Sequence, residues 1–498
     1  MSTNSREDPD ARRLWNEFFF SAPQLKRDSL GSALEFMCMG SLRLSLAAAL
    51  FVAMFWTFTC RPPRAGPRVS ARLAPAETSA GNSPSYAFIN GRWFTGRDFK
   101  TRTFYSVAGT LQAKHPARVD STIDLAGGFV VPPFGDAHTH NLNGPSQLPT
   151  LARAYLEEGT FYVQVLTNAR SGADAVRGQF NHPCTLDAVY ANGGLTSTLS
   201  HPFLAYEPFA MGLYNPSEWH AHAGEIRQSR LLENDAYWFI DTEADLDAKW
   251  TQLLADHPNL IKVFLLDASD SASALVDTGL PQGHGLKPSL VVEVVRRAHA
   301  AGRRVAAHIE TAQDFALAVD AGVDLVAHLP GYEMPTGADP SRFEVPEKAA
   351  RLAARRGVFL TPTVSLAVIA EGPDSVATVR ARQLLQHRNL QVLLREGVAI
   401  VVGSDWYGKT AHGEVETLRA LGLWDNLGLL KLWAEATPQA IFPHRRIGRL
   451  ASGYEANFLV LRENPLERPE ALGHIALRVK QGCLIDPTLA AESVPRRK

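Results

Sequence analysis

The sequence predicts an α/β protein, namely a (β/α)8 TIM barrel accompanied by a small β domain. One unit recurs along the chain: an amphipathic helix, a glycine that ends it, an apolar strand, and a polar residue where the strand ends. Such alternation over a chain of 498 residues is typical of a closed parallel barrel. The 45% hydrophobic content is sufficient for a large core and a smaller second one.

Eight strands are predicted to alternate with helices. Three of them are Phe129–Val131, Gly194–Thr198 and Leu260–Leu266. The other five each follow a glycine: Gly159 before Phe161–Leu166, Gly302 before Arg304–His308, Gly322 before Leu325–His328, Gly357 before Val358–Thr363, and Gly397 before Ala399–Asp405. In a barrel of this kind the active site lies at the carboxyl ends of the strands.

A small β unit precedes the predicted barrel. The segment Tyr86–Phe94 contains the step Asn90-Gly91 between apolar and aromatic residues, which is a strong signal for a β-hairpin. Further short strands are expected at Thr103–Tyr105 and Ser121–Leu125.

Composition excludes several classes of protein. A net charge of -1 without a basic stripe argues against nucleic acid as a partner, and we expect a small-molecule substrate instead. The four cysteines form no CxxC motif, so a disulfide framework and a cysteine-based zinc site are not expected to organise the fold. Any metal ion would therefore be held by His, Asp, Glu or Lys.

A His-x-His pair follows the strand predicted at Phe129–Val131. Because side chains alternate along an extended backbone, His138 and His140 share one face and can converge on a divalent ion such as zinc. His220 and His222 have the same spacing, but no strand is predicted around them. We interpret that second pair as surface or loop histidines.

Four more polar residues belong to predicted strands of the barrel. His308, His328 and Asp405 stand at strand ends, where the histidine pair also lies. Lys262 lies inside an apolar strand, and burial of an ammonium group is costly unless it is neutralised. Its free amine would be able to add carbon dioxide and bridge two metal ions as a carbamate; the alternative is a lysine that snorkels at the strand edge.

These residues resemble the motifs of the amidohydrolase superfamily, in particular its imidazolonepropionase-like and prolidase-like metal-dependent hydrolases. The resemblance extends from Tyr86 to Leu466. Its motifs are Asp136-Ala-His138-Thr-His140, Ile261-Lys262, Ala307-His308-Ile-Glu-Thr, Val326-Ala-His328, Gly403-Ser-Asp405 and the segment Ile447–Leu461.

The resemblance implies a hydrolase of amide or other C–N bonds with two divalent metal ions, expected to be zinc. By that resemblance His138 and His140 bind one ion, His308 and His328 bind the second, carbamylated Lys262 bridges them, and Asp405 is both ligand and catalytic base. Such ions turn a water molecule into a nucleophile and polarise the carbonyl group. Asp136 is expected to support the site without binding metal.

Substrate contacts are expected from outside the ligand set. An aromatic insertion of about sixty residues follows the third strand, and it either walls a substrate pocket or packs on itself. In the first case His201 would touch the substrate, and Arg170 and His412 are further candidates near strand ends. The insertion contains His201 and the aromatic residues Phe203, Tyr206, Phe209, Tyr214, Trp219 and Trp238.

Three other functions compete with this prediction. The segment 403–410 matches the phosphate-loop pattern GxxxxGK[ST], which would make the chain a nucleotide-binding protein, although Asp405 would place a carboxylate among the phosphates. A non-catalytic binding barrel would be expected to have lost ligands. A mononuclear deaminase of the same fold would use one metal ion and leave Lys262 as a bystander.

The expected domains follow from these assignments. The resemblance implies that strands Phe458–Leu461 and Ile475–Lys480 complete a β-sandwich with the first β unit. We expect an exported or membrane-anchored homo-oligomer, with Cys60 as a possible lipid attachment site and Met37 or Met39 as an alternative start. The divisions are a disordered leader (1–43), a signal peptide or membrane anchor (44–60), a linker (61–85), the first sandwich part (86–131), the barrel (132–446), the second sandwich part (447–485) and a tail (486–498).

Overall fold

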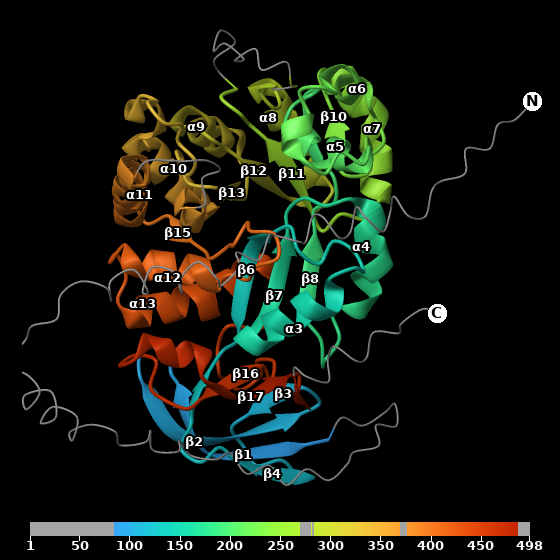
Figure 1. Ribbon diagram of the computed structural model, residues 1–498. Helices are drawn as coiled ribbons and strands as arrows, with labels where there is room; N and C mark the ends of the chain where they lie inside the picture. Colours follow the sequence, from blue (N-terminus) through green and yellow to red (C-terminus); the bar gives the residue numbers. More distant parts are fainter. Residues whose placement is uncertain (1–83, 269–279, 281–282, 369–375, 487–498) are drawn as a thin grey trace, which may run out of the picture.

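The computed structural model describes residues 84–268, 280, 283–368 and 376–486. The segments 1–43 and 44–60 lie outside these residues, as do nearly all of the linker and of the tail. Figure 1 shows parallel strands in the centre, helices α4 to α7 on one side of them, helices α9 to α13 on the other, and a mixed sheet beneath. In the described part of the chain no helix is both long and apolar enough to cross a membrane.

The central strands form two parallel sheets. One has seven strands in the order β10-β9-β11-β12-β13-β14-β15, and the other has three in the order β6-β7-β8. The α/β class is therefore confirmed. The strands are β6 (Phe134–Thr139), β7 (Thr160–Val165), β8 (Asp187–Tyr190), β9 (Gly194–Thr196), β10 (Tyr237–Phe239), β11 (Leu260–Phe264), β12 (Arg304–His308), β13 (Leu325–Ala327), β14 (Phe359–Thr361) and β15 (Ala399–Ile400).

Backbone hydrogen bonds connect the two sheets at both edges. Ala137 N donates to Val402 O at 2.8 Å and Asp405 N donates to His138 O at 2.7 Å, which joins β6 to the segment that follows β15. At the other edge, β8 and β9 are separated by only three residues; β8 pairs with β7, and β9 pairs with β11.

Glycine ends the helices as the sequence predicted. Gly159, Gly322 and Gly357 cap α3, α9 and α10 in the left-handed conformation, which a residue without Cβ adopts at little cost. The α-helices are α3 (Leu148–Glu158), α4 (Arg170–Val176), α5 (Phe203–Ala210), α6 (Ala223–Gln228), α7 (Glu243–Ala255), α8 (Pro288–Ala300), α9 (Ala312–Ala321), α10 (Glu347–Arg356), α11 (Val376–Glu396), α12 (His412–Ala420), α13 (Asn426–Lys431) and α14 (Thr437–Ile441), with short helical turns η2 (Arg177–Gln179), η3 (Pro216–Glu218), η4 (Pro340–Phe343), η5 (Val364–Val368), η6 (Leu432–Ala436) and η7 (Pro469–Gly473).

The mixed sheet, in which β4 and β5 run parallel to β1 and the other neighbouring strands are antiparallel, joins the two ends of the described chain. Strand β5 pairs with β1 on one side and with β16 on the other, so the expected union of segments before and after the parallel strands is confirmed. The strands are β1 (Tyr86–Phe94), β2 (Phe99–Val107), β3 (Thr110–Gln112), β4 (Ser121–Asp124), β5 (Phe129–Val131), β16 (Phe458–Leu461), β17 (Ile475–Lys480) and β18 (Cys483–Leu484).

Two local predictions are wrong. Asn90-Gly91 forms no hairpin turn: the step lies inside β1, at an irregularity in its pairing with β2, and Asn90 has a φ of 57°. A β-bulge uses the same left-handed residue as a hairpin turn, so the local signal does not distinguish them. Strand Phe129–Val131 belongs to the mixed sheet, and a separate strand, β6, carries His138.

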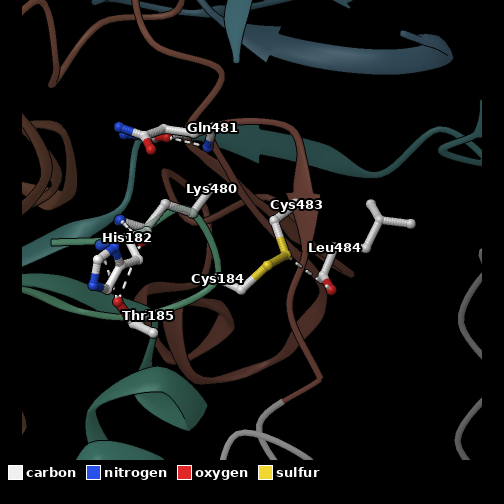
Figure 2. Close-up of a disulfide and its surroundings, with 8 residues drawn as sticks. His182, Cys184, Thr185, Lys480, Gln481, Cys483 and Leu484 are labelled. Carbon is white, nitrogen blue, oxygen red and sulfur yellow. Dashed lines mark hydrogen bonds between the residues drawn. A yellow bond between two sulfur atoms is a disulfide. The ribbon is translucent and has the colours of Figure 1, made fainter. Parts of the chain in front are cut away.

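A disulfide joins regions that are distant in sequence. Cys184 and Cys483 are 299 residues apart, with Cα atoms separated by 5.5 Å, and Figure 2 shows the bond beside Lys480. Lys480 is fully buried, and its Nζ lies 2.9 Å from Asp187 Oδ1. This bond was not predicted from the four cysteines, because pairing over such a separation has no local signature.

Loss of the disulfide is expected to destabilise the protein. Replacing Cys184 and Cys483 with serine should lower the stability of the folded chain by about 2–4 kcal/mol, since the cross-link restricts the unfolded state. Thermal unfolding of the double variant, with and without reductant, measures this. Reductant should lower the wild-type midpoint and leave the variant unchanged; a wild-type midpoint insensitive to full reduction would contradict the prediction.

Candidate functional site

All six predicted metal ligands line one cavity of about 200 Å³. It lies where the carboxyl ends of the parallel strands meet. The residues lining it are His138, His140, Thr167, His201, Pro202, Ala205, Tyr206, Lys262, Phe264, His308, His328, Tyr332, Glu333, Leu366, Asp405 and Tyr407.

His138, His140 and Asp405 form a compact group. His138 Nε2 lies 3.2 Å and His140 Nε2 lies 2.8 Å from Asp405 Oδ1. Potential ligand atoms of these three residues all lie within 4.8 Å of one another, as required of a group that holds one ion. His138 stands in β6, His140 directly follows it, and the hydrogen bond from Asp405 N to His138 O fixes the aspartate opposite the pair.

The other predicted ligands, His308, His328 and Lys262, lie against this group. The ring centroids of His308 and His328 are 4.4 Å apart, and those of His138 and His328 are 4.9 Å apart. His328 Nδ1 lies 3.7 Å from Asp405 Oδ2, which links both halves through one carboxylate. Lys262 is 1% exposed, and its Nζ lies 5.4 Å from the centroid of the Phe264 ring.

The donor groups fit divalent metal ions. His138 Nδ1 and His308 Nε2 are buried without a hydrogen-bond partner among the described residues, although a buried nitrogen normally has one. Burial, and then neighbouring positive groups, lower the pKa values of His138, His308 and His328 well below the usual value. Neutral imidazole is the form that binds metal.

Two histidines are oriented through their second nitrogen. His140 Nδ1 lies 2.8 Å from the carbonyl oxygen of Thr167, and His328 Nδ1 lies 2.9 Å from the hydroxyl of Thr363. A partner on Nδ1 fixes the ring and leaves Nε2 available to bind an ion, as is common for metal-binding histidines. Neither threonine was predicted from the sequence, because the contact of each with its histidine depends on how neighbouring strands are placed.

Burial also changes the basicity of Lys262. It lowers the pKa of the ammonium group to about 7, and Asp405 only partly opposes this effect. A substantial share of this lysine is then the free amine at neutral pH, which is the form that reacts with carbon dioxide.

Asp136 supports the site from beneath. Its Oδ1 accepts hydrogen bonds from Ser404 N at 3.0 Å and His138 N at 3.3 Å, and its Oδ2 accepts from Ser404 Oγ at 2.8 Å and Tyr155 Oη at 3.1 Å. The carboxylate therefore ties the strand with His138 to the residue before Asp405. The structure thus places it as the sequence analysis expected, beside the ligands and outside the cavity lining.

Removal of this carboxylate is expected to be costly. Asp136→Ala removes an acceptor shared by three buried residues and leaves the backbone N–H groups of Ser404 and His138 without it, so stability should fall by about 3 kcal/mol or more. Thermal unfolding measures the loss, with Asp174→Asn, a change in an exposed ion pair, as the control. A midpoint for Asp136→Ala equal to that of the control would contradict this role.

Of the three residues predicted to contact substrate, one lines the cavity and two do not. His201 lines the cavity, and its ring stacks on His308 with centroids 5.1 Å apart. Burial lowers the pKa of His201 to about 3, so this ring is neutral beside the ligands. Arg170 and His412 are absent from the lining: Arg170 pairs with Asp174 at 3.0 Å, and His412 begins α12 with its ring toward Trp433.

The aromatic insertion contributes to the cavity and also packs in part on itself. His201 and Tyr206 form part of the cavity wall. Phe203 and Phe239 belong to a small separate core together with Tyr237, whereas Trp238 belongs to the main core. His220 and His222 lie in a turn, as expected of loop histidines.

Several lining residues were not anticipated, among them Tyr332, Glu333 and Tyr407. The ring of Tyr332 stacks on His328 with centroids 4.1 Å apart, and Tyr407 stacks on His140 at 5.2 Å. Glu333 completes the wall beside Tyr332. Their proximity in sequence to His328 and Asp405 was a usable signal, because residues that follow a strand end often border the site.

The phosphate-loop match has another explanation. The backbone N–H of Ser404 donates to Asp136, that of Asp405 to His138, and that of Gly408 to Asn141. Phosphate loops bind through free N–H groups of this kind, and here protein acceptors occupy them. The carboxylate of Asp405 also faces the histidines. Both observations argue against nucleotide binding at 403–410.

Known proteins share this architecture. Neither a protein-family model nor a curated protein matches the sequence. A solved amidohydrolase is 20% identical and has a TM-score of 0.60, covering 80% of this chain and 98% of its own. The ochratoxinase of A. niger is 17% identical and has a TM-score of 0.63; the match covers 82% of this chain and 98% of the ochratoxinase. A prolidase complexed with N-methylphosphonate-L-proline is 20% identical, with a TM-score of 0.59 and coverage of 81% and 99%.

The chain therefore has the fold of the amidohydrolase superfamily. The expected resemblance is confirmed at the level of the fold, over most of this chain and nearly all of each compared structure.

Proposed function

We propose that this protein is a metal-dependent hydrolase of amide or other C–N bonds. The observation that carries the proposal is the convergence of His138, His140, His308, His328 and Asp405, with Lys262, on one cavity at the strand ends. These residues come from β6, β11, β12 and the segments that follow β6, β13 and β15, so their meeting requires the whole fold.

Backbone geometry supports the assignment. His328 and Asp405 adopt left-handed conformations with φ values of 78° and 47°, which cost energy for residues with a Cβ. Such strain is retained where surrounding structure imposes it, and it concentrates at functional sites.

The residues would hold two ions. His138 and His140 with Asp405 would hold one, His308 and His328 the other, and Lys262 would bridge them after its amine adds carbon dioxide and releases a proton. When bound, such ions acidify a water molecule and polarise the scissile carbonyl group.

Asp405 moves the proton in this proposal. Hydrolysis adds the elements of water across the C–N bond, with OH on the carbonyl carbon and H on the leaving nitrogen. Asp405 accepts the proton that the water loses and returns it to the nitrogen, so it is first a base and then an acid. Its carboxylate is 12% exposed, and this burial limits exchange of the proton with bulk water.

We infer that the parallel strands close into an eight-stranded barrel and that the mixed sheet folds over itself as a sandwich. The interrupted strand β8–β9 and the hydrogen bonds between β6 and residues 402–405 support closure. Contacts of Phe458 with Phe88 and Trp93, two strands away in the sheet, support the sandwich. Hydrogen exchange tests closure: the amides of Ala137 and Asp405 should be among the slowest to exchange.

Metal content and turnover test the function together. The protein purified from residue 84 onward and supplied with zinc should contain about two ions per chain and hydrolyse members of a panel of dipeptides, lactams and N-acyl amines. One ion per chain with turnover of amino-substituted rings would favour the mononuclear deaminase. No ion after supply of metal would overturn the proposal.

We also propose export of the protein as a homo-oligomer. The disulfide between Cys184 and Cys483 supports an oxidising compartment, since such bonds rarely persist in a reducing cytosol. N-terminal sequencing of the mature protein tests cleavage within 44–60, and light scattering tests the assembly. A reduced pair in protein from its native source would contradict export.

A further inference from the structure

The cavity opens to solvent on one side. Of the described residues that line it, His201 and Glu333 are exposed, and all the others are buried or half-buried. The ring of His201 packs on His308 and Phe264, with centroid distances of 5.1 and 5.2 Å, so its exposed part faces away from them. The two exposed residues therefore mark the opening of the cavity.

Two tyrosines bound the cavity beside His140. The ring of Tyr407 stacks on that of His140, with centroids 5.2 Å apart and planes inclined by 23°. Tyr206 is 2% exposed and lines the same cavity from α5. Burial raises the pKa of both phenols, and each phenol also changes the pKa of the other, which requires their hydroxyl groups to be close. Tyr206 and Tyr407, here called the tyrosine wall, thus meet although they come from the insertion and from the segment after β15.

Asn141 holds Tyr407 in place. Its Oδ1 accepts a hydrogen bond from Gly408 N at 2.8 Å, and its Nδ2 donates to Lys409 O at 2.6 Å. Asn141 is fully buried and directly follows His140 in the chain. The segment that carries Tyr407 therefore cannot move away from His140 without breaking buried hydrogen bonds, which is costly.

Glu207 holds Tyr206 in place in a similar way. This neighbouring glutamate is fully buried and accepts hydrogen bonds from Leu232 N at 2.7 Å, from Leu231 N at 3.1 Å and from the hydroxyl of Tyr237. Tyr206 and Tyr237 also belong to the small separate core of the insertion. Both halves of the tyrosine wall are thus fixed, and a fixed wall resists a group that is too large for the space beside it.

The cavity is small for a ligand site. Its volume is about 200 Å³, whereas sites for small molecules typically enclose roughly 300–1,000 Å³. In the proposed function the metal ions and the attacking water take up part of that volume. A substrate group that faces the tyrosine wall must fit the remaining space, whereas a group that faces the opening can extend into solvent.

We propose that the tyrosine wall makes the protein selective for amides in which one of the two groups flanking the C–N bond is compact, while the other group extends through the opening at His201 and Glu333. This inference rests on the proposed function and adds the class of substrate. It makes Tyr206 and Tyr407 residues that determine specificity without taking part in bond cleavage. The selection is steric, so it does not depend on the charge of the substrate.

Two series of amides test the proposal on the zinc-loaded protein. One series enlarges the acyl group from acetyl through phenylacetyl to naphthylacetyl, with methylamine as the amine. The other keeps acetyl and enlarges the amine from methylamine through benzylamine to naphthylmethylamine. We expect kcat/KM to fall by about tenfold or more along one series and to stay level along the other, because only one side is walled. Level values along both series, or equal falls along both, would overturn the proposal.

Variants of the tyrosine wall isolate its role. Tyr206→Ala should raise kcat/KM about tenfold for the enlarged substrates of the restricted series, whereas Tyr206→Phe keeps the ring and should keep the limit. Tyr407→Ala is a second enlargement, for use if Tyr206→Ala does not fold. Tyr214→Ala changes a tyrosine of the same insertion outside the cavity lining and should leave both series unchanged. A limit that persists in a folded alanine variant with the metal content of the wild type would contradict the proposal.

Binding separates this inference from the proposed function. Calorimetry on the zinc-loaded protein uses N-methylacetohydroxamate, a metal chelator, and two enlarged forms of it, one with naphthylacetyl in place of acetyl and one with naphthylmethyl in place of methyl. Weaker binding of one enlarged form, restored in Tyr206→Ala, would support the selectivity even if the protein hydrolyses nothing. Equal binding of all three compounds would overturn the selectivity, whatever the activity. Binding of none by a protein that holds its ions would overturn both proposals.

Discussion

Replacing Asp405 with asparagine is expected to lower kcat by about 10³-fold or more, because the change removes both the proton acceptor and a metal ligand. Asparagine keeps the size of the side chain, so the close approach to His138 and His140 at 3.2 and 2.8 Å can persist. Steady-state kinetics on the best substrate of the panel measures the effect.

Two comparisons make the Asp405 result specific. Asp174→Asn lies in an exposed pair with Arg170 and should leave kcat unchanged. Metal content of Asp405→Asn, measured on the same preparation, separates loss of the base from loss of an ion. Activity within about tenfold of the wild type would show that another group moves the proton.

Replacing Lys262 with alanine is expected to lower the metal content from about two ions per chain to one or fewer, since the bridging oxygen atoms are lost. Elemental analysis measures the ions. Carbon NMR after incubation with labelled bicarbonate should show a carbamate carbon in the wild type that is absent from the variant. These readouts are independent of any substrate.

A matched lysine and chemical rescue sharpen this test. Lys409→Ala removes an exposed lysine beside Trp406 and should retain both ions; it also removes the lysine of the phosphate-loop pattern. Acetate fits the space vacated by the lysine side chain and should restore metal content to Lys262→Ala. Two ions in Lys262→Ala without acetate would exclude the bridge.

Local sequence was sufficient for the individual elements. Alternating apolar strands and glycines predicted Gly159, Gly322 and Gly357 as helix ends, and strands β16 and β17 begin and end at the expected residues. Strand periodicity and the glycine stop are properties of neighbouring residues, so they can be read before the chain is folded. For the same reason the six candidate ligands were found from their places at or within predicted strands.

Local sequence failed where one signal serves two structures. Asn90-Gly91 suits a turn or a bulge, and only the pairing of β1 with β2 made it a bulge. Likewise, the lengths of Phe129–Val131 and Phe134–Thr139 do not reveal which sheet each strand joins; their partners β16 and β7 decide that.

The sequence by itself thus determined the α/β class, several helix and strand ends, and the identities of His138, His140, Lys262, His308, His328 and Asp405 as candidate ligands. The tertiary structure decided which of these groups lie within a few ångströms of one another, and it excluded Arg170 and His412 from the cavity wall. It also added Thr363, Glu333 and the pairing of Cys184 with Cys483, 299 residues apart. The physical reason is that periodicity and backbone propensity act over a few residues, whereas contacts between distant segments exist only once the core has formed.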